Sequence, residues 1–566
     1  MREASLRRRL GFALLMSLML LAPLASLDSA AHESAKLGKL GTVHFPTSAR
    51  SRDAQAHFLR GVAALHSFWY PVALEEFRAA TEMEPDFAMA YWGQAMTYNH
   101  PLWGDPQETD AARNALSHVT NSAGMTPREH AYLAAAKILY GQGEKRDRDR
   151  AYAAAMEEIY RTHPDDLEAA AFYALALLGA VQPHDPTALR TRMKAGALVQ
   201  EVYRREPDHP GGAHYMLHAF DDPDHAVLAL RAAEQYAEIA PGAPHALHMP
   251  SHIFLQLGLW SESASSNAAS WAASEQWVRD RGLRIDQRDY HSLHWLFYSY
   301  IQQARYEEAK RLLQIMQESL PQFSTDDPYN VLYGLYVEAQ MAAGYLTATR
   351  QWDMRETILS HSRPAVDVPP AASPSKVQSM TTLARTPALF AAGFASAMVG
   401  APEWRVSQEQ LRGVRQHIDG MDLPLLAALP EILEVQELEI TAVAAAAQQR
   451  FDEAIETMTR AIRLVQAMPP PSGPPPVITP PHELFGQILL LANRPEEAAE
   501  EFALALRRHP NRAASLLGAA RAASRQGDRL AAAKAYATLA RQWAQASAQW
   551  PDVEEARLYL KEVGTP

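Results

Sequence analysis

The sequence predicts an all-α protein built as a solenoid of stacked helix-turn-helix units. Three observations lead to this fold class. The 566 residues exceed what one hydrophobic core usually serves, so either several domains or an elongated array with no single large core is expected. Small and aromatic residues recur with a period of about 34 residues. Alanine, the strongest helix former, dominates stretches such as residues 513–523 and 531–540, where small side chains also allow close helix packing.

The first 31 residues have the pattern of a secretory signal peptide. Arginines at positions 2 and 7–9 precede an apolar run over residues 10–27, and small residues follow at 29–31. A retained membrane anchor is the alternative, but Pro23, Ser26 and Asp28 interrupt the run before it reaches the roughly 20 apolar residues that span a bilayer. We therefore predict cleavage after Ala31, export to the periplasm or the cell exterior, and no membrane span after cleavage. Residues 32–53 are expected to form an amino-terminal extension.

Residues 54–87 form the first repeat unit, and two further units lie near the carboxyl end. The first unit carries its small, aromatic and proline residues at Gly61, Ala64, Ala73, Phe77, Ala80 and Pro85. The same offsets recur at Gly486, Ala498, Phe502, Ala505 and Pro510, and the series continues one period later at Gly527, Ala532 and Tyr536. This pattern resembles the tetratricopeptide repeat (TPR). The resemblance implies a TPR-like α-solenoid whose first helices line a concave groove, with capture of an extended peptide as the common use of that groove.

Two proline-rich stretches divide the predicted array. Residues 363–375 and 469–481 are rich in proline, which removes helical hydrogen-bond donors, so both are expected to be loops. The expected organisation begins with a TPR-like array that has a histidine-rich groove, residues 54–345. An irregular helical middle with a proline-rich loop follows over residues 346–430. A second TPR-like array covers residues 431–566 and is interrupted by the proline-rich loop at 469–481.

Histidines occupy matching places in successive units. A unit that starts at Pro244 has His245, His248 and His252 at its positions 2, 5 and 9, and these spacings share one helical face. The register also gives His291 and His294 at positions 2 and 5 of the next unit, His214 and His218 at positions 8 and 12 of the preceding first helix, and His66 and His100 at position 13 of the first two units. In TPRs, positions 2, 5, 9, 12 and 13 of the first helix face the concave groove. The resemblance therefore implies that imidazoles gather there.

Clustered imidazoles on neighbouring helices predict a transition-metal site. Neutral imidazole is a favoured ligand of Zn, Cu, Fe and Ni, and helices packed about 8–10 Å apart bring facing side chains within reach of one ion. Pairs at i and i+4 supply two ligands from one helix. The predicted ligands of a divalent Zn, Cu or Fe ion are His214, His218, His245, His248, His252, His291 and His294. Asp221, Asp222 and Asp224 follow His218 closely enough to orient ligand imidazoles or to complete the shell.

Further residues are expected to line the same groove: His66, Trp92, His100, Asp222 and Tyr298. Trp92 and Tyr298, at positions 5 and 9 of their units, should flank the imidazoles and give a ligand an apolar wall. A structural interpretation of the histidines remains open, because single imidazoles commonly hydrogen-bond a carbonyl or stack on an aromatic ring. In that interpretation Pro250 begins a helix and leaves His245 and His248 in a loop.

The function expected first is an exported TPR scaffold whose histidine-rich groove binds a transition metal, a peptide or protein partner, or a small ligand. A metal-dependent enzyme, hydrolase or oxidoreductase, that uses the same histidines is the first alternative. The chain lacks the HExxH, P-loop and GxSxG motifs that would name catalytic residues. A structural subunit of an envelope complex is the second alternative.

Composition narrows the possible partners and chemistry. A net charge of -12 without a long Lys/Arg stripe argues against nucleic acid. The absence of cysteine excludes disulfides and thiolate chemistry. Without a metal, the clustered imidazoles are expected to protonate near pH 6.5 and to repel one another, so ligand binding is expected to weaken below that pH.

Overall fold

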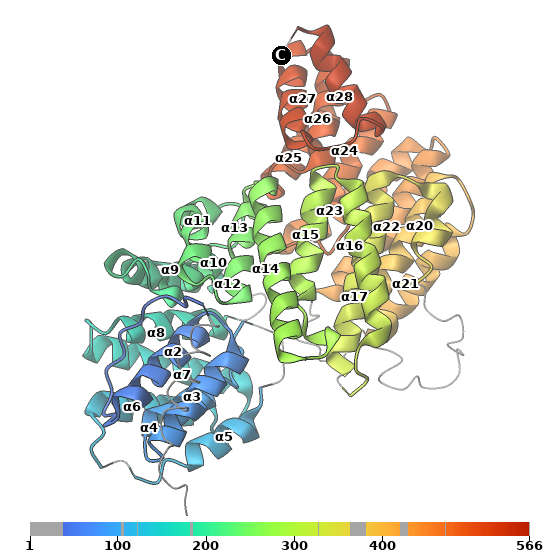
Figure 1. The fold of residues 1–566 in the computed structure, drawn as a ribbon. Coiled ribbons are helices and arrows are strands. Elements are labelled where there is room, and N and C mark those ends of the chain that lie inside the picture. Colours follow the sequence, from blue (N-terminus) through green and yellow to red (C-terminus); the bar gives the residue numbers. More distant parts are fainter. Residues whose placement is uncertain are drawn as a thin grey trace, which may run out of the picture.

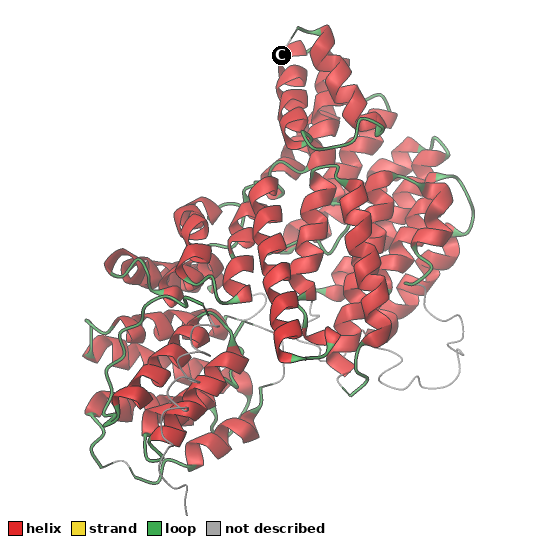
Figure 2. Cartoon of the chain, viewed as in Figure 1, coloured by secondary structure: helices red, strands yellow, loops and turns green. Residues whose placement is uncertain are grey.

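Helices make up all the regular structure in the described part of the chain (Figures 1 and 2). The structure is a computed structural model that describes residues 38–102, 107–121, 123–181, 185–326, 328–362, 381–418, 428–469 and 471–564. The all-α prediction is confirmed. The predicted signal peptide and the first proline-rich stretch, residues 363–375, lie outside the described residues.

The first half of the chain forms a continuous series of packed helices. Its elements are α2 (Arg52–His66), α3 (Tyr70–Met83), α4 (Ala88–Met96), α5 (Thr109–Ser117), α6 (Pro127–Leu139), α7 (Lys145–Thr162), α8 (Leu167–Ala180), α9 (Ala188–Arg205), α10 (Pro210–Ala219), η1 (Ala226–Ala229), α11 (Leu230–Ile239), α12 (Pro244–His248), α13 (Pro250–Gln256), α14 (Trp260–Arg281), η2 (Ile285–Gln287), α15 (Tyr290–Gln302) and α16 (Tyr306–Ser319). Neighbours in sequence, such as α2 with α3 and α14 with α15, pack against each other. This local stacking is the organisation of a solenoid.

The second half continues the stack. Its elements are η3 (Leu320–Gln322), α17 (Pro328–Thr349), η4 (Trp352–Met354), α18 (Arg355–Ile358), α20 (Thr386–Met398), α21 (Trp404–Ile418), α22 (Leu429–Ala447), α23 (Phe451–Ala467), α24 (Pro481–Leu491), α25 (Pro495–Arg508), α26 (Ala513–Gln526), α27 (Arg529–Gln542) and α28 (Pro551–Glu562). In the stretch expected to be irregular, α20 and α21 form a helix pair that packs between α17 and α22. The predicted loop before α24 has no regular secondary structure in its described residues.

A glycine–phenylalanine–glycine contact explains the repeat pattern at both ends of the chain. The Phe77 ring fills the space beside Gly61 and Gly93, and a Cβ atom at Gly61 would lie 2.7 Å from that ring. Phe502 fills the same space beside Gly486 and Gly518 in the carboxyl-terminal array. Glycine is required because any side chain would collide with the aromatic ring that joins one unit to the next. The predicted TPR-like α-solenoid is confirmed.

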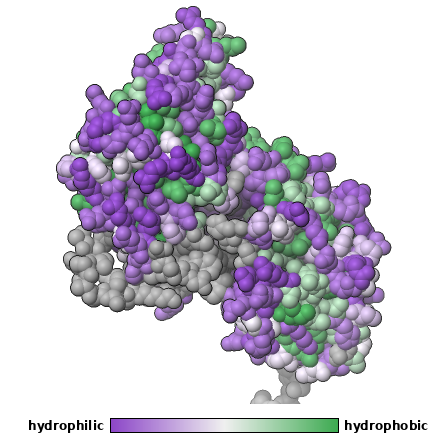
Figure 3. Space-filling view, turned by 180° about the vertical axis from the view of Figure 1, so that it is seen from behind, coloured by the Kyte–Doolittle hydropathy of each residue, from purple (hydrophilic) through white to green (hydrophobic). Residues whose placement is uncertain are grey.

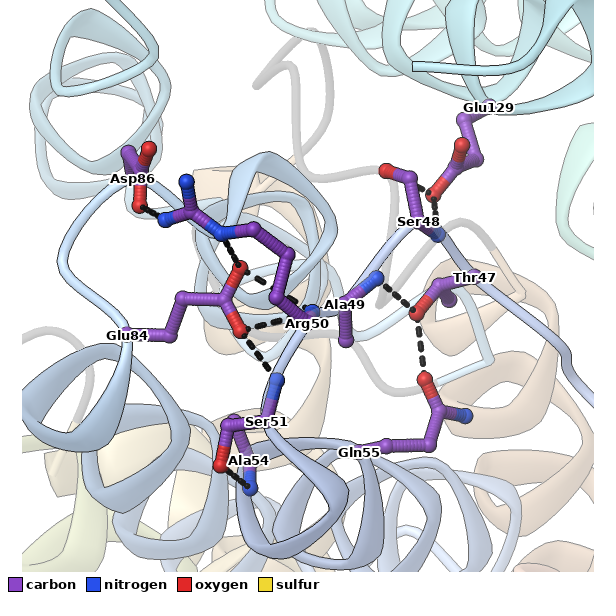
Figure 4. Close-up of polar contacts among 10 residues, drawn as sticks. All are labelled: Thr47, Ser48, Ala49, Arg50, Ser51, Ala54, Gln55, Glu84, Asp86 and Glu129. Carbon is purple, nitrogen blue, oxygen red and sulfur yellow. Dashed lines mark hydrogen bonds and ion pairs between the residues drawn. The ribbon is translucent and has the colours of Figure 1, made fainter. Parts of the chain in front are cut away.

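The N-terminal segment, residues 38–51, is an ordered part of this fold (Figure 4). The amide and the hydroxyl of Ser48 donate to Glu129 at 2.7 and 2.9 Å, and the amides of Arg50 and Ser51 donate to Glu84. Phe45 is 1% exposed and its ring lies 4.9–5.5 Å from three aromatic rings: Phe58, Trp92 and Tyr132. The segment therefore closes the aromatic core of the first units.

The carboxyl-terminal array returns to contact the amino-terminal array. The Trp260 indole donates to the carbonyl of Asn511 at 2.9 Å, and Gln542 and Trp543 donate to the carbonyl of Gln302. The described residues of the second proline-rich stretch, 468–469 and 471–480, which we call the Pro-rich loop, also contact this region. Its Pro471 carbonyl accepts a hydrogen bond from Gln256, and its Gly473 packs on Trp295.

The surface gives no sign of a membrane-spanning helix in the described part of the chain. Among those residues, no helix is both long enough and apolar enough to cross a bilayer. The face seen in Figure 3 carries mostly hydrophilic residues, with hydrophobic ones scattered among them. Scattered apolar residues of this kind are ordinary on a folded surface.

Candidate metal centre

Three neighbouring stretches, α10, α12–α13 and α15, bring six histidines together in two groups. The first triad consists of His214, His218 and His245, and the second triad consists of His248, His252 and His291. In each triad, one nitrogen from every ring lies within 4.8 Å of the other two. Both triads therefore have the donor types and the spacing of a metal site.

The break between α12 and α13 does not scatter the histidines. Met249 separates the two helices, but its backbone angles, φ -54° and ψ -35°, are helical. Pro250 begins α13, where its missing N–H costs little. The chain thus keeps its direction, and His245, His248 and His252 stay on one side. The alternative in which His245 and His248 lie in a loop is wrong, because α12 contains both.

Two imidazoles of the second triad point unprotonated nitrogens at each other. Nδ1 of His252 donates to the Asp221 carboxylate at 2.7 Å, and Nδ1 of His248 donates to Oδ1 of Asn267 at 2.7 Å. The Asn267 orientation follows from its Nδ2, which donates to the carbonyl of Ser263. Both rings, when neutral, carry their proton on Nδ1 and a lone pair on Nε2. The two Nε2 atoms lie only 3.1 Å apart.

The first triad has a related geometry. Nδ1 of His214 donates to the backbone carbonyl of His66 at 2.6 Å, which leaves the lone pair of His214 on Nε2. That Nε2 lies 3.1 Å from Nε2 of His218. The His245 ring completes the group, with its centroid 5.0 Å from that of His214. A backbone carbonyl here has the orienting role that Asp221 has in the second triad.

An aromatic side chain borders each triad. The Phe68 ring lies 4.4–5.8 Å from the three rings of the first triad. The Trp295 ring lies 4.2–5.3 Å from the three rings of the second triad. His214 and His248 are fully buried, and His252 is 9% exposed. The histidines therefore lie between apolar walls, largely withdrawn from water.

Burial favours the neutral form of five of these imidazoles. Burial lowers the pKa of His214 to about 3, and it also places the pKa values of His218, His245, His248 and His291 well below the ordinary 6.5. The expectation that the metal-free cluster protonates near pH 6.5 is therefore wrong for these five rings, because burial disfavours their charged form. Neutral imidazole is the form that binds metals, so the triads are ready for metal binding at neutral pH.

A third group, His66, Glu168 and His209, has a different character. The Glu168 carboxylate is fully buried and accepts hydrogen bonds from Nε2 of His66 at 2.7 Å and from Nε2 of His209 at 3.2 Å. Burial opposes its ionisation, but the nearby His209 and His66 lower the pKa of Glu168 far below its ordinary value. Nδ1 of His66 accepts from the Tyr215 hydroxyl, and Nδ1 of His209 accepts from the amide of Gly212. Every ring nitrogen is already paired, so this group is a hydrogen-bonded network.

Five other predicted residues lie apart from the triads. His294 has no hydrogen bond or ring contact with the six histidines among the described residues, although burial lowers its pKa to about 4. His100 lies on the Tyr70 ring and donates to the carbonyl of Thr97. Asp222 accepts from His225 and Arg192 and orients neither triad, whereas its neighbour Asp221 does. The remaining two are the expected aromatic wall residues, Trp92 and Tyr298.

The two expected aromatic wall residues do not touch the triads. Trp92 is 1% exposed and packs on Phe45, so the N-terminal segment covers the face that was expected to be open. Tyr298 packs on Trp260 and accepts a hydrogen bond from Arg512, so it lies behind Trp295. The residues that do form the walls are Phe68 and Trp295. They follow the predicted residues His66 and His294 closely in the sequence. Repeat register alone does not distinguish them from core residues.

Comparison with known proteins assigns the chain to no family. No protein-family model and no curated protein matches the chain. Among solved structures, a human IFIT1 dimer with m7Gppp-AAAA has a TM-score of 0.35 at 12% identity, covering 86% of this chain and 90% of that one. The TPR domain of P58(IPK) has a TM-score of 0.21 at 14% identity, covering 71% and 100%. These TM-scores are low, and the solenoid assignment depends on the helix packing of this chain itself.

Proposed function

We propose that this chain is a TPR-like binding scaffold whose two histidine triads bind transition-metal ions. One observation carries the proposal: the Nε2 lone pairs of His248 and His252 face each other at 3.1 Å. Two lone pairs at this distance repel unless a cation lies between them or close to both. A proton would make one ring cationic, and burial disfavours the charged form of His248. A metal ion satisfies both nitrogens without protonating either ring.

The geometry fits common metal–imidazole distances. Two nitrogens, each about 2.0–2.1 Å from an ion and arranged tetrahedrally, lie roughly 3.3 Å apart. The 3.1 Å separations in both triads are close to this value. The hydrogen bond from His252 to Asp221 supplies the carboxylate partner that metal-bound imidazoles usually have. Zn, Cu and Fe all accept imidazole ligands.

A metal-dependent enzyme, hydrolase or oxidoreductase, is the second candidate. Three protein ligands per ion leave a coordination position for water or substrate, which is the arrangement of catalytic rather than structural zinc sites. A peptide or protein partner is compatible with either function, because stacked helical repeats present long binding surfaces. The signal-peptide pattern of residues 1–31 supports export to the periplasm or cell exterior.

The test is a measurement of metal content. The chain is purified without a histidine tag, incubated with Zn(II) or Cu(II), desalted and analysed for metal by mass spectrometry. We expect bound metal in the wild type and a clear loss in the double variant His248→Ala/His252→Ala. His294→Gln is the matched control and should retain the wild-type metal content. The proposal fails if the wild type retains no metal, or if the double variant retains as much as the control.

A further inference from the structure

We propose that the two triads form one dinuclear copper centre, in which two ions share a small oxygen-donor ligand such as hydroxide. The inference depends on the proposed metal-binding function and specifies how many ions bind, which metal they are, and what ligand they take.

Ring spacing supports a single centre. Between the triads, the centroids of His218 and His252 lie 6.0 Å apart, as do those of His245 and His248. Within the triads, the longest centroid distances are 6.5 Å for His218 with His245 and 6.3 Å for His252 with His291. The six rings are thus a continuous cluster with no gap between the triads. Ions in two-metal sites typically lie about 3.5–4 Å apart, which this packing permits.

Shared helices also connect the triads. His245 of the first triad and His248 of the second lie in the same short helix, α12, three residues apart. A helix places such residues side by side on one face. One ligand of each triad is therefore held by the same backbone.

Charge favours copper. The ligands are six imidazoles, and two carboxylates close to the second triad, Asp221 and Asp289, have no Arg or Lys partner among the described residues. Asp222 is already paired with Arg192. In the reduced state two Cu(I) ions balance these two carboxylates, because +2 and -2 sum to zero. Zinc has no such monovalent state, so two Zn(II) ions leave a buried excess of +2 until an anion binds. Uncompensated buried charge is costly. Copper also binds nitrogen ligands more tightly than the other divalent first-row metals.

Access to the centre restricts the ligand to a small one. Phe68 and Trp295 cover the two triads from the sides, and the Pro-rich loop places Gly473 against Trp295. Gln256 donates both to Asp221 at 3.0 Å and to the Pro471 carbonyl of that loop at 2.9 Å. The loop is thereby attached to the residue that orients His252. This close surrounding of side chains and backbone favours a small ligand such as hydroxide over a peptide. Oxidised copper, with a higher charge, takes this anion as the shared ligand.

Spin counting tests the proposal. The untagged chain is loaded with Cu(I) without oxygen, oxidised with ferricyanide and desalted, and its copper content and EPR signal are measured on the same sample. We expect two copper ions per chain with an EPR spin count far below the copper content, because a shared hydroxide couples the two unpaired electrons. The variant His248→Ala/His291→Ala retains the first triad and should bind one copper with one full spin. The mirror variant His214→Ala/His245→Ala should give the same result, and circular dichroism checks that each variant keeps its helices.

Each outcome has a distinct meaning. Two copper ions with two full spins overturn the shared centre but leave metal binding intact. One copper per wild-type chain also overturns it. No copper in the wild type also overturns it, and the proposed metal binding itself is contradicted only if the wild type retains no Zn(II) either.

Discussion

Asp221 determines which nitrogen of His252 faces the second triad. Its carboxylate accepts the Nδ1–H of His252, and its charge stabilises a bound cation. Replacing such an outer partner typically costs about 10–100-fold in metal affinity. We expect Asp221→Asn to lie near the lower end, about tenfold, because the amide oxygen still accepts the hydrogen bond while the charge is lost. Competition with a chromophoric copper chelator measures the affinity.

Asp222→Asn provides the control for this substitution. Asp222 is the next residue, is similarly buried, and contacts His225 and Arg192 but neither triad. Its substitution removes the same charge without changing the orientation of a ligand. Equal affinities for the two variants would contradict a specific effect of the Asp221 charge on the ion bound by His252.

The sequence predicts the histidines of the two triads better than it predicts the residues that form hydrogen bonds with the histidines. Spacings of three and four residues and the repeat register place histidines on one helical face, and all six members of the triads are among the predicted ligands. His294 shares that register and lies on α15 with His291, but only His291 belongs to a triad. Asn267 and Glu168 could not be predicted, since their contacts with His248 and His66 join separate helices.

Acid should destabilise the metal-free protein. The pKa of His214 is lowered to about 3 by burial, and the pKa values of His248 and other triad members are lowered too, whereas an unfolded chain has the ordinary value of 6.5. Below pH 6.5 the unfolded state therefore binds more protons, so stability is retained above pH 6.5 and lost as the pH falls. Each such histidine contributes up to about 1.4 kcal/mol per pH unit. Urea unfolding at pH 7.5, 6.5 and 5.5 should show the decrease below 6.5, with a smaller slope in His214→Gln. Equal stability at pH 7.5 and 5.5 would contradict neutral, buried imidazoles.

At the scale of the helical element, the glycine contacts should be the sensitive points of the repeat. Gly518 lies on α26 against the Phe502 ring, so Gly518→Ala inserts a methyl group where no space exists. Overpacking of this kind costs about 1–3 kcal/mol. Gly413→Ala on α21 is the control, because a Cβ atom there has nothing within 4 Å, and it should stabilise by about 0.5–1 kcal/mol. Urea midpoints compare the two variants, and a Gly518→Ala variant as stable as Gly413→Ala would refute the packing argument.

Helix starts in the repeats could be predicted from local residues, and deviations from the repeat could not. The predicted unit starts at Pro244 and Tyr290 are the first residues of α12 and α15. The position of Phe45 in the aromatic core has no local signal, because residues 38–51 contain no helix and their contacts are with distant helices. Local sequence patterns predict where a helix begins, whereas the packing of one segment over another depends on the fold of the whole chain.

At the scale of the whole molecule, the two arrays meet through residues far apart in sequence. Arg512 of the carboxyl-terminal array donates to the Tyr298 hydroxyl and forms a buried ion pair with Glu483. The Pro-rich loop enters the same region and contacts Gln256. The sequence predicts that this stretch is a loop, but its location beside the second triad follows from the curvature of all the units between them. Such curvature accumulates from small rotations and is not encoded in any one repeat.

Metal removal should therefore weaken the fold across several helices. An ion in the first triad would connect α10 with α12, and an ion in the second triad would connect α12 and α13 with α15, so metal binding to the folded state alone adds stability by mass action. At a free metal concentration of about 100 times the dissociation constant, the gain is roughly 2.7 kcal/mol. Scanning calorimetry should show a lower unfolding temperature after treatment with a chelator and recovery when Cu(II) is returned. His218→Ala/His252→Ala should unfold at the same temperature with or without metal. If that variant were stabilised as much as the wild type, the stabilisation would come from ions bound elsewhere and not from the triads.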